Sequence, residues 1–182
     1  MNKDFKELLK VIKKNDVITI YGHINPDGDS FGSGLGLREI LKTNFPDKKV
    51  YTVGYGLNHF YDRFGKYDEV SDETIKQSLG IVLDCSEVER VSDQRIRLAK
   101  QIVKFDHHIE NGPFFGIKYV DEGAIATCQI IYEFAKACEV VKQEFVNPYD
   151  TTELANIIKE IEKIANNMGC KYLMLTSGKS RV

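Results

Sequence analysis

Short apolar runs rich in β-branched residues alternate along this chain with segments of helical periodicity. The runs cover 17–21, 49–53, 80–83 and 101–105. Continuous apolar runs of this length are typical of strands buried on both faces of a sheet. Their alternation with helices favours parallel strands joined by helical connections. We therefore expect an α/β fold with a doubly wound, mainly parallel sheet and helices on both faces.

Helices are predicted where apolar residues recur at intervals of three and four. The predicted helices cover 2–14, 31–43, 72–78, 91–100 and 125–137. A last helix and strand are expected within 153–175, beyond a turn at Asn147-Pro148. We place a domain boundary at this turn. It separates a principal domain, 1–146, from a C-terminal extension, 147–182, that does not form an independent domain.

The composition limits the compartments and partners that we expect. Hydrophobic residues make up 42% of the 182 residues, which is enough for one buried core. The charged residues of both signs are interspersed and the formal net charge is −2, so long duplex nucleic acid is not an expected partner. The four cysteines form no C-x-x-C pair, and neither a signal peptide nor a membrane-spanning stretch is recognisable. We expect a cytoplasmic protein without membrane association.

An imidazole and two carboxylates follow the first apolar run. His23 is followed by Asp27 and Asp29, with Pro26 and Gly28 permitting a sharp turn between them. Carboxylate oxygens with imidazole suit Mn²⁺, Mg²⁺, Fe²⁺ or Zn²⁺, and the absence of a nearby cysteine argues against a structural zinc site. Because Asn-Pro-Asp-Gly is also an ordinary turn sequence, this segment alone leaves both interpretations open.

Two further apolar runs end in groups of the same kind. Asp84 ends the third run, and Asp106, His107 and His108 directly follow the fourth. Since the carboxyl ends of parallel strands meet at one edge of a sheet, we expect these side chains near the first group. Adjacent histidines point to different sides, so one is able to bind metal while the other faces substrate. Asp106 is suited to hold an imidazole in one tautomer.

Three other residues of suitable chemistry have weaker support. Arg90 and Arg95 lie close to Asp84 in the sequence, and Arg90 is our candidate for contacting a substrate phosphate. Solvated side chains are the commoner explanation for such arginines. His59 stands apart from the strand ends, and we interpret it as incidental.

These segments resemble, in order and spacing, the first three motifs of the DHH phosphoesterase superfamily. The matching stretches are Gly22 to Ser30, Val82-Leu83-Asp84 and Phe105-Asp106-His107-His108. The segment from Asp121 to Ile130 is similar to the one that follows in the branch containing nanoRNases and pAp phosphatases. Together the resemblance covers about residues 1 to 140.

The resemblance implies a site for two divalent ions, Mn²⁺ before Mg²⁺ or Fe²⁺. The implied ligands are His23 and Asp27 for one ion, Asp29 and His107 for the other, and Asp84 as a bridge. His108 is implied to contact the scissile phosphate and Asp106 to support the histidines. Two close ions of this kind lower the pKa of a bridging water and hold the phosphate, so the chemistry needs no protein nucleophile.

The implied function is hydrolysis of phosphate esters in nucleotides or very short oligonucleotides, as an oligoribonuclease or exonuclease of the nanoRNA type or a pAp phosphatase. Two alternatives stay open. One is a catalytically impaired module that binds metal or nucleotide, and the other is a pyrophosphatase or polyphosphatase of the same superfamily. The segment Thr127 to Gln129 argues against the second. The oligomeric state is not determined by the sequence, and a homodimer is one alternative.

The chain departs from the family beyond the third motif. The fourth motif supplies another metal-binding aspartate on a later strand, and neither Asp121 nor Asp150 ends a predicted strand here. The glycine-rich, histidine-containing loop of the family's substrate-clamping domain has no counterpart. Residues 153–181 instead resemble a helix and strand of a GNAT acetyltransferase without its coenzyme A loop. We expect no acetyl transfer and interpret this tail as packing at the sheet edge.

Overall fold

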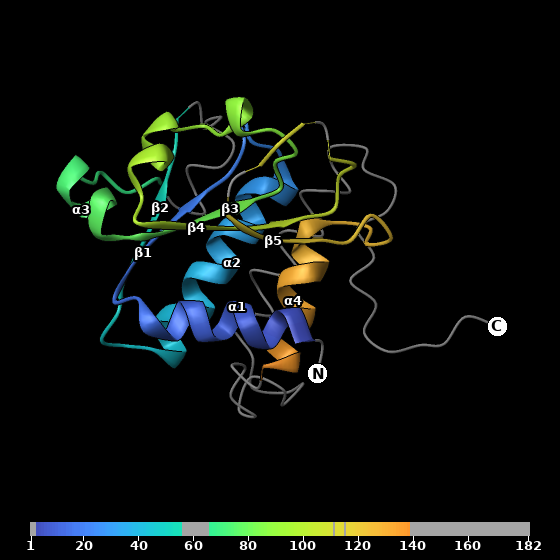
Figure 1. Ribbon diagram of the computed structural model, residues 1–182, viewed down its shortest axis with the longest axis horizontal. Helices are drawn as coiled ribbons and strands as arrows, with labels where there is room; N and C mark the ends of the chain where they lie inside the picture. The colour runs from blue at the N-terminus through green and yellow to red at the C-terminus, as the bar shows by residue number, and fades with distance from the viewer. Residues whose placement is uncertain (1–2, 56–65, 111, 115, 139–182) are drawn as a thin grey trace. The chain divides into compact units, whose positions relative to one another are not determined.

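The computed structural model describes residues 3–55, 66–110, 112–114 and 116–138. The elements in chain order are α1 Lys3–Lys14, β1 Val17–Tyr21, α2 Gly28–Asn44, β2 Lys49–Val53, α3 Asp72–Gln77, β3 Leu79–Leu83, the short 3-10 helices η2 Val88–Arg90 and η3 Gln94–Leu98, β4 Gln101–Asp106, β5 Ile117–Val120 and α4 Thr127–Ala137 (Figure 1). The predicted boundary at 147–148, the extension with its GNAT-like segment, His59 and Asp150 lie outside the described residues.

The strands form one parallel sheet in the order β2-β1-β3-β4-β5. Ile20 of β1 pairs with Thr52 of β2 on one side and with Ile81 of β3 on the other. Every strand pair in this sheet is parallel. The chain proceeds outward from β1 to β2 and then returns to the opposite side of β1, so β1 and β3 flank the point where the winding reverses. Open α/β sheets bind their ligands at the carboxyl ends of the strands beside this point.

The larger core lies between the sheet and the helices α1, α2 and α4, which share one face (Figure 1). Phe5 of α1, Leu37 of α2 and Phe134 of α4 are buried against the sheet in this core. The ring of Phe134 makes edge contacts with Phe5 at 5.5 Å and with Phe105 of β4 at 5.1 Å between centroids. Burial of these apolar side chains is the main contribution that orients α2 and α4 on the sheet.

The opposite face carries α3 and the two 3-10 helices over a smaller core that includes Val82 and Ile96. Buried Asp93 caps η3 by accepting a hydrogen bond from the backbone N–H of Arg95, and its carboxylate also pairs with the guanidinium of Arg95 at 2.7 Å. Arg95 reaches Asp72 of α3 at 3.2 Å. Helices therefore cover both faces, and the predicted fold class is confirmed. Within the described residues, no helix is both long and apolar enough to cross a membrane.

The predicted helix over 91–100 is wrong. Its first residues pair with the loop after β1, because Ser92 N donates to Gly22 O at 2.9 Å and Ile24 N donates to Arg90 O at 2.8 Å. These hydrogen bonds hold the backbone near residue 91 in an extended conformation. Only the two short 3-10 helices form on either side of this pairing. The other predicted helices and strands within the described residues agree closely with the structure.

Strand β5 is absent from the sequence-based expectation. It lies at the edge of the sheet beside β4, is only half-buried, and contains the exposed Lys118. Asp121 follows β5 directly, so this candidate for the fourth-motif aspartate does stand at the carboxyl end of a strand. Its Oδ1 atom accepts a hydrogen bond from Gly123 N at 3.0 Å in the turn that leads toward α4.

Phe134→Ala tests whether packing in the larger core holds α4 on the sheet. We expect the free energy of unfolding to fall by about 3–5 kcal/mol, because the change leaves a cavity between α1 and β4. Urea unfolding followed by circular dichroism measures this loss. Tyr132→Ala on the same helix is the control, since Tyr132 is 52% exposed and should cost no more than about 0.5 kcal/mol. Equal losses for the two variants would contradict the assignment.

Candidate metal centre

The predicted site residues come together at the carboxyl ends of β1, β3 and β4. Asp84 directly follows β3 and lies in the middle, with its side chain only 1% exposed. Its backbone is in the left-handed region, at φ 57°, a conformation that aspartate tolerates better than most residues. His23 lies in the loop between β1 and α2, and His107 directly follows β4. The topology therefore brings three distant segments to one buried carboxylate.

The imidazole nitrogens lie around Asp84 at the spacing of metal ligands. His23 Nε2 is 3.6 Å from Asp84 Oδ2, and His107 Nε2 is 3.5 Å from Asp84 Oδ1. These separations are too long for good hydrogen bonds. Two ligand atoms that share one ion at about 2.1 Å each lie at most about 4.2 Å apart, so the observed distances fit a shared cation. Nitrogen and oxygen donors without thiolate suit Mn²⁺, Fe²⁺ or Mg²⁺.

Backbone carbonyls orient both rings. The Nδ1 atom of His23 donates to the carbonyl oxygen of Ile24 at 2.8 Å, and that of His107 donates to the carbonyl oxygen of Ala124 at 3.3 Å. A carbonyl oxygen only accepts, so Nδ1 carries a proton in each ring, whether the imidazole is neutral or charged. This leaves both Nε2 atoms facing the carboxylates, as in metal-binding histidines whose other nitrogen is held by a backbone partner.

Two helix N-termini point at the site. Asp27 caps α2, since its Oδ1 accepts hydrogen bonds from the backbone N–H groups of Asp29 and Ser30, both at 3.0 Å. The carboxylate of Asp29 accepts from Thr127 N and Cys128 N, both at 2.8 Å, so it caps α4 from a distant part of the chain. The positive ends of the two helix dipoles therefore favour negative charge at this place.

The pKa values of the site residues are shifted because three carboxylates lie close to the two imidazoles. The carboxylate of Asp27, followed by that of Asp84, raises the pKa of His23 to about 10 against the effect of burial. Asp84 likewise raises the pKa of His107 to about 9. Burial raises the pKa of Asp84, but the attraction of His107 and His23 outweighs it, and the net shift is downward. Burial, followed by repulsion from Asp84, raises the pKa of Asp29 to about 6.

Among the described residues, two groups of ligand atoms are close enough to hold a metal ion, and they share Asp84. The groups are His23, Asp27 and Asp84, and Asp84, His107 and His108. Asp29 also lies beside the second group, with its Oδ2 atom 3.6 Å from His107 Nε2. In His108 the nitrogen nearest Asp84 is Nδ1, which is also hydrogen-bonded to Asp106 Oδ1 at 2.8 Å. Asp106 and His108 are thus in the same cluster as the predicted ligands.

The two arginines differ in what they contact. Arg95 pairs with Asp93 and Asp72 on the face of α3, so its guanidinium contributes to the fold. Arg90 lies at the end of η2, where its carbonyl oxygen accepts from Ile24 N, and its side chain is exposed. The backbone of Arg90 is therefore beside the metal-site loop, which keeps it a candidate for substrate contact.

Four site contacts were not predicted from the sequence. The Thr127 hydroxyl donates to Asp84 Oδ1 at 3.0 Å, and the N–H groups of Thr127 and Cys128 bind Asp29. Lys104 of β4 lies fully buried with its ammonium 3.1 Å from Asp106 Oδ2. A lone lysine inside an apolar run was the available signal for Lys104. For Thr127, only its place at the start of a predicted helix was visible.

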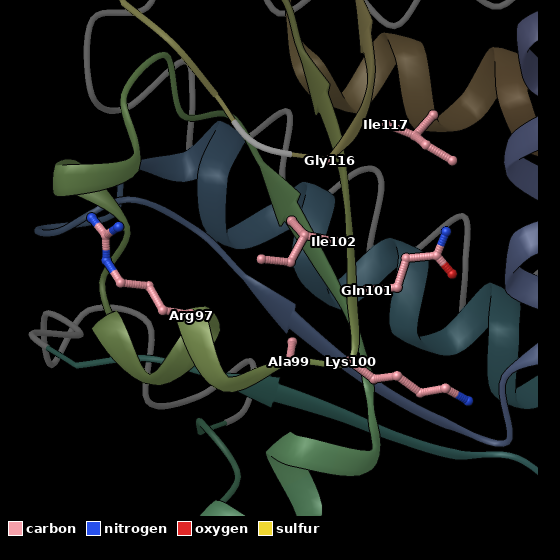
Figure 2. A pocket seen from close by; sticks show the side chains of 7 residues that line it. All are labelled: Arg97, Ala99, Lys100, Gln101, Ile102, Gly116 and Ile117. Atoms are coloured by element: carbon pink, nitrogen blue, oxygen red, sulfur yellow. The ribbon is translucent and has the colours of Figure 1, made fainter.

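A separate hollow of about 320 Å³ lies at the other end of β4 and β5 (Figure 2). Its lining residues are Arg97, Ala99, Lys100, Gln101, Ile102, Gly116 and Ile117. Gln101 and Ile117 are the first residues of their strands, whereas the candidate metal ligands lie beyond the carboxyl ends of the strands. None of the predicted site residues lines this hollow.

Comparisons with known proteins show which family the chain is related to. The family model described as DHH family, N-terminal domain, matches residues 17–164. The chain belongs to the DHH family. It is 36% identical over 130 residues to the bifunctional oligoribonuclease and PAP phosphatase NrnA of Bacillus subtilis, and 37% identical over 131 residues to the probable NrnA of Streptococcus mutans. These matches cover 70% and 72% of this DHH chain but only 40% and 42% of the relatives.

A solved structure supports the fold of this DHH chain. The crystal structure of an exopolyphosphatase-related protein from Bacteroides fragilis superposes with a TM-score of 0.66 and covers 96% of this chain and 64% of the other. The two sequences are 21% identical, so the likeness concerns the fold alone. The family resemblance found in the three motifs is confirmed.

Binding of Mn²⁺ should release protons. With pKa values of about 10 and about 9, His23 and His107 are protonated near neutral pH in the metal-free protein, whereas bound imidazole must be neutral. Mn²⁺ affinity should therefore rise as the pH is raised toward about 9. Isothermal titration calorimetry in two buffers of different ionisation enthalpy measures the release. His107→Gln should release fewer protons, and heats that do not depend on the buffer would contradict the prediction.

Proposed function

We propose that this chain is a metal-dependent phosphoesterase that hydrolyses phosphate esters of nucleotides or very short oligonucleotides. The observation that carries the proposal is the buried carboxylate of Asp84 with an imidazole on each side, in a member of the DHH family. The names of the relatives, bifunctional oligoribonuclease and PAP phosphatase, support this substrate class. Since the chain spans less than half of their length, activity with these substrates is part of the proposal.

The proposed ligands divide into two sets. His23 and Asp27 would hold one divalent ion and Asp29 and His107 the other, with the carboxylate of Asp84 shared between the two sets. In support, Asp84 Oδ2 faces His23 and Asp84 Oδ1 faces His107. Two divalent ions held by these residues, most suitably Mn²⁺, would supply a water of lowered pKa and would neutralise charge on the phosphate oxygens. The helix N-termini of α2 and α4 add fixed positive potential for the same anion.

His108 is proposed to orient the phosphate. Its Nδ1–H donates to Asp106 Oδ1, which leaves Nε2 for a phosphate oxygen, and its side chain is 48% exposed. In its protonated form the ring donates from Nε2 while Asp106 holds it in place. Arg90 is the proposed second contact, since its side chain is exposed and its backbone lies beside the His23 loop.

We also propose a cytoplasmic location, to which the free thiols of Cys85, Cys128 and Cys138 are suited.

Hydrolysis assays test the activity. We expect Mn²⁺-stimulated hydrolysis of pAp, a linear dinucleotide or bis(4-nitrophenyl) phosphate, and a loss of more than about 100-fold in the double variant Asp27→Asn/His107→Ala. The same assay with pyrophosphate tests the alternative within the superfamily. A wild-type rate no higher than that of the double variant, measured with metal bound, would refute the proposed activity.

Metal stoichiometry distinguishes the enzyme from an impaired binding module. We expect elemental analysis of the Mn²⁺-loaded chain to give two ions per chain, because two ligand sets share Asp84. A single ion, together with nucleotide binding and no turnover, would instead favour a module that binds without hydrolysis. The double variant Asp27→Asn/His107→Ala serves as the reference for non-specific metal.

A further inference from the structure

Lys104 places a positive charge in the interior of the protein, close to the residues that follow Asp84 and to Asp106. It stands within β4 in register with Val82 of β3, and its side chain is fully buried. Val82 belongs to the smaller core, on the face that carries the 3-10 helices. A lysine in such a place is strongly destabilising unless charged or polar partners surround it.

The partners of Lys104 come from the loop after β3 and from the carboxyl end of β4. Its Nζ atom is 3.3 Å from the carbonyl oxygen of Cys85 and 3.5 Å from that of Ser86, the two residues that follow Asp84. The same atom is 3.1 Å from Asp106 Oδ2, an ion pair in which both side chains are fully buried. One ammonium group therefore contacts the loop after β3 and the last residue of β4.

The carboxylate of Asp106 contacts Lys104 through one oxygen and the two histidines through the other. While Oδ2 faces Lys104, Oδ1 accepts hydrogen bonds from His107 N at 2.9 Å, His108 N at 3.2 Å and His108 Nδ1 at 2.8 Å. Oδ1 is thus hydrogen-bonded, whereas the buried Oδ2 has no hydrogen bond and is balanced by the ion pair with Lys104. A rotation of the carboxyl group would disturb the three donors to Oδ1 together. Fixing one oxygen by an ion pair fixes the other.

Among the described residues, Glu110 and Phe114 also lie beside the ammonium. Glu110 Oε1 is 3.6 Å from Lys104 Nζ, while Glu110 Oε2 is 2.6 Å from Lys118 Nζ on β5. The ring of Phe114 lies 4.8 Å from Lys104 Nζ, at the distance of a cation–π contact. Lys118 is 45% exposed and pairs with Lys104 in the register of β4 and β5. The two lysines therefore share one carboxylate, but only Lys104 is paired with Asp106 in the structure.

We propose that Lys104 is a positioning residue, whose buried ammonium orients Asp106, and through it His108, while holding the loop that carries Asp84. The inference rests on the proposed function in so far as His108 is the group that meets the phosphate. Lys104 itself touches neither metal nor substrate. It affects turnover by fixing the orientation of the Asp106 carboxylate.

The first test needs neither metal nor substrate. In the metal-free wild-type protein, a ¹H–¹⁵N correlation spectrum should show a protected Nδ1–H resonance of His108, assigned by its absence in His108→Gln. Lys104→Met keeps the length of the side chain and removes the charge, and we expect this resonance to be lost to exchange with water. Lys118→Met removes a cation from Glu110 without affecting Asp106, and should leave the resonance unchanged.

The second test measures coupling. We expect Lys104→Met to lower kcat for pAp and the affinity for Mn²⁺ by about 10- to 100-fold, and Asp106→Asn to do the same. If Lys104 acts through Asp106, the double variant Lys104→Met/Asp106→Asn will be no worse than either single variant. In Lys104→Met the buried carboxylate of Asp106 loses its cation, whereas the double variant has no carboxylate at this position. If Lys104→Met does not fold, the comparison of the double variant with Asp106→Asn still decides whether Lys104 acts through Asp106.

Three results would overturn the proposal: an unchanged His108 resonance in Lys104→Met, the same loss in Lys118→Met, or losses from Lys104→Met and Asp106→Asn that multiply in the double variant. A wild-type chain that hydrolyses none of the phosphoesters refutes the proposed function instead. In that case the resonance and the Mn²⁺ affinities still decide the role of Lys104.

Discussion

The buried carboxylate of Asp84 is the constraint on which the site depends. A negative charge in the interior is tolerated only where positive or hydrogen-bonding groups surround it. Here those groups come from three separate parts of the chain: His23 after β1, His107 after β4, and the hydroxyl of Thr127 at the start of α4. The parallel order of the strands brings them together, because it places the carboxyl ends of β1, β3 and β4 side by side.

The geometry of the centre also depends on packing far from it. Asp29, on the first turn of α2, binds the N-terminus of α4, so the two helices meet at the site. At the other end of α4, Phe134 lies in the larger core against Phe5 and Phe105. A shift of α4 along the sheet would move Thr127 away from Asp84. Core packing and ligand geometry are therefore linked through one helix.

The sequence predicts the parts of the structure that local pattern decides. The strand bounds 17–21 and 49–53 follow from runs of β-branched residues, and the meeting of their ends follows from parallel topology. The helix expected over 91–100 fails because its first residues pair with the distant loop after β1. The edge strand β5 is missed because it is short and carries Lys118 on an exposed position.

Site contacts made across large sequence separations were beyond the same reasoning. No local pattern tells that Thr127 meets Asp84, or that Asp29 caps a helix that begins almost one hundred residues later. The residue types for metal binding were recognisable, since each stands just after an apolar run. The groups that hold those residues in place became visible only when the packing of α4 and β4 was known.

The backbone at Asp84 restricts the evolution of this position. Its left-handed conformation is readily adopted only by glycine, asparagine and aspartate, and of these only aspartate supplies a carboxylate. A related protein that had lost the proposed activity would no longer need the carboxylate at this position. It would still need a residue that adopts the left-handed conformation. Asparagine or glycine at this position would therefore be the mark of a descendant that retains the fold as a pseudoenzyme.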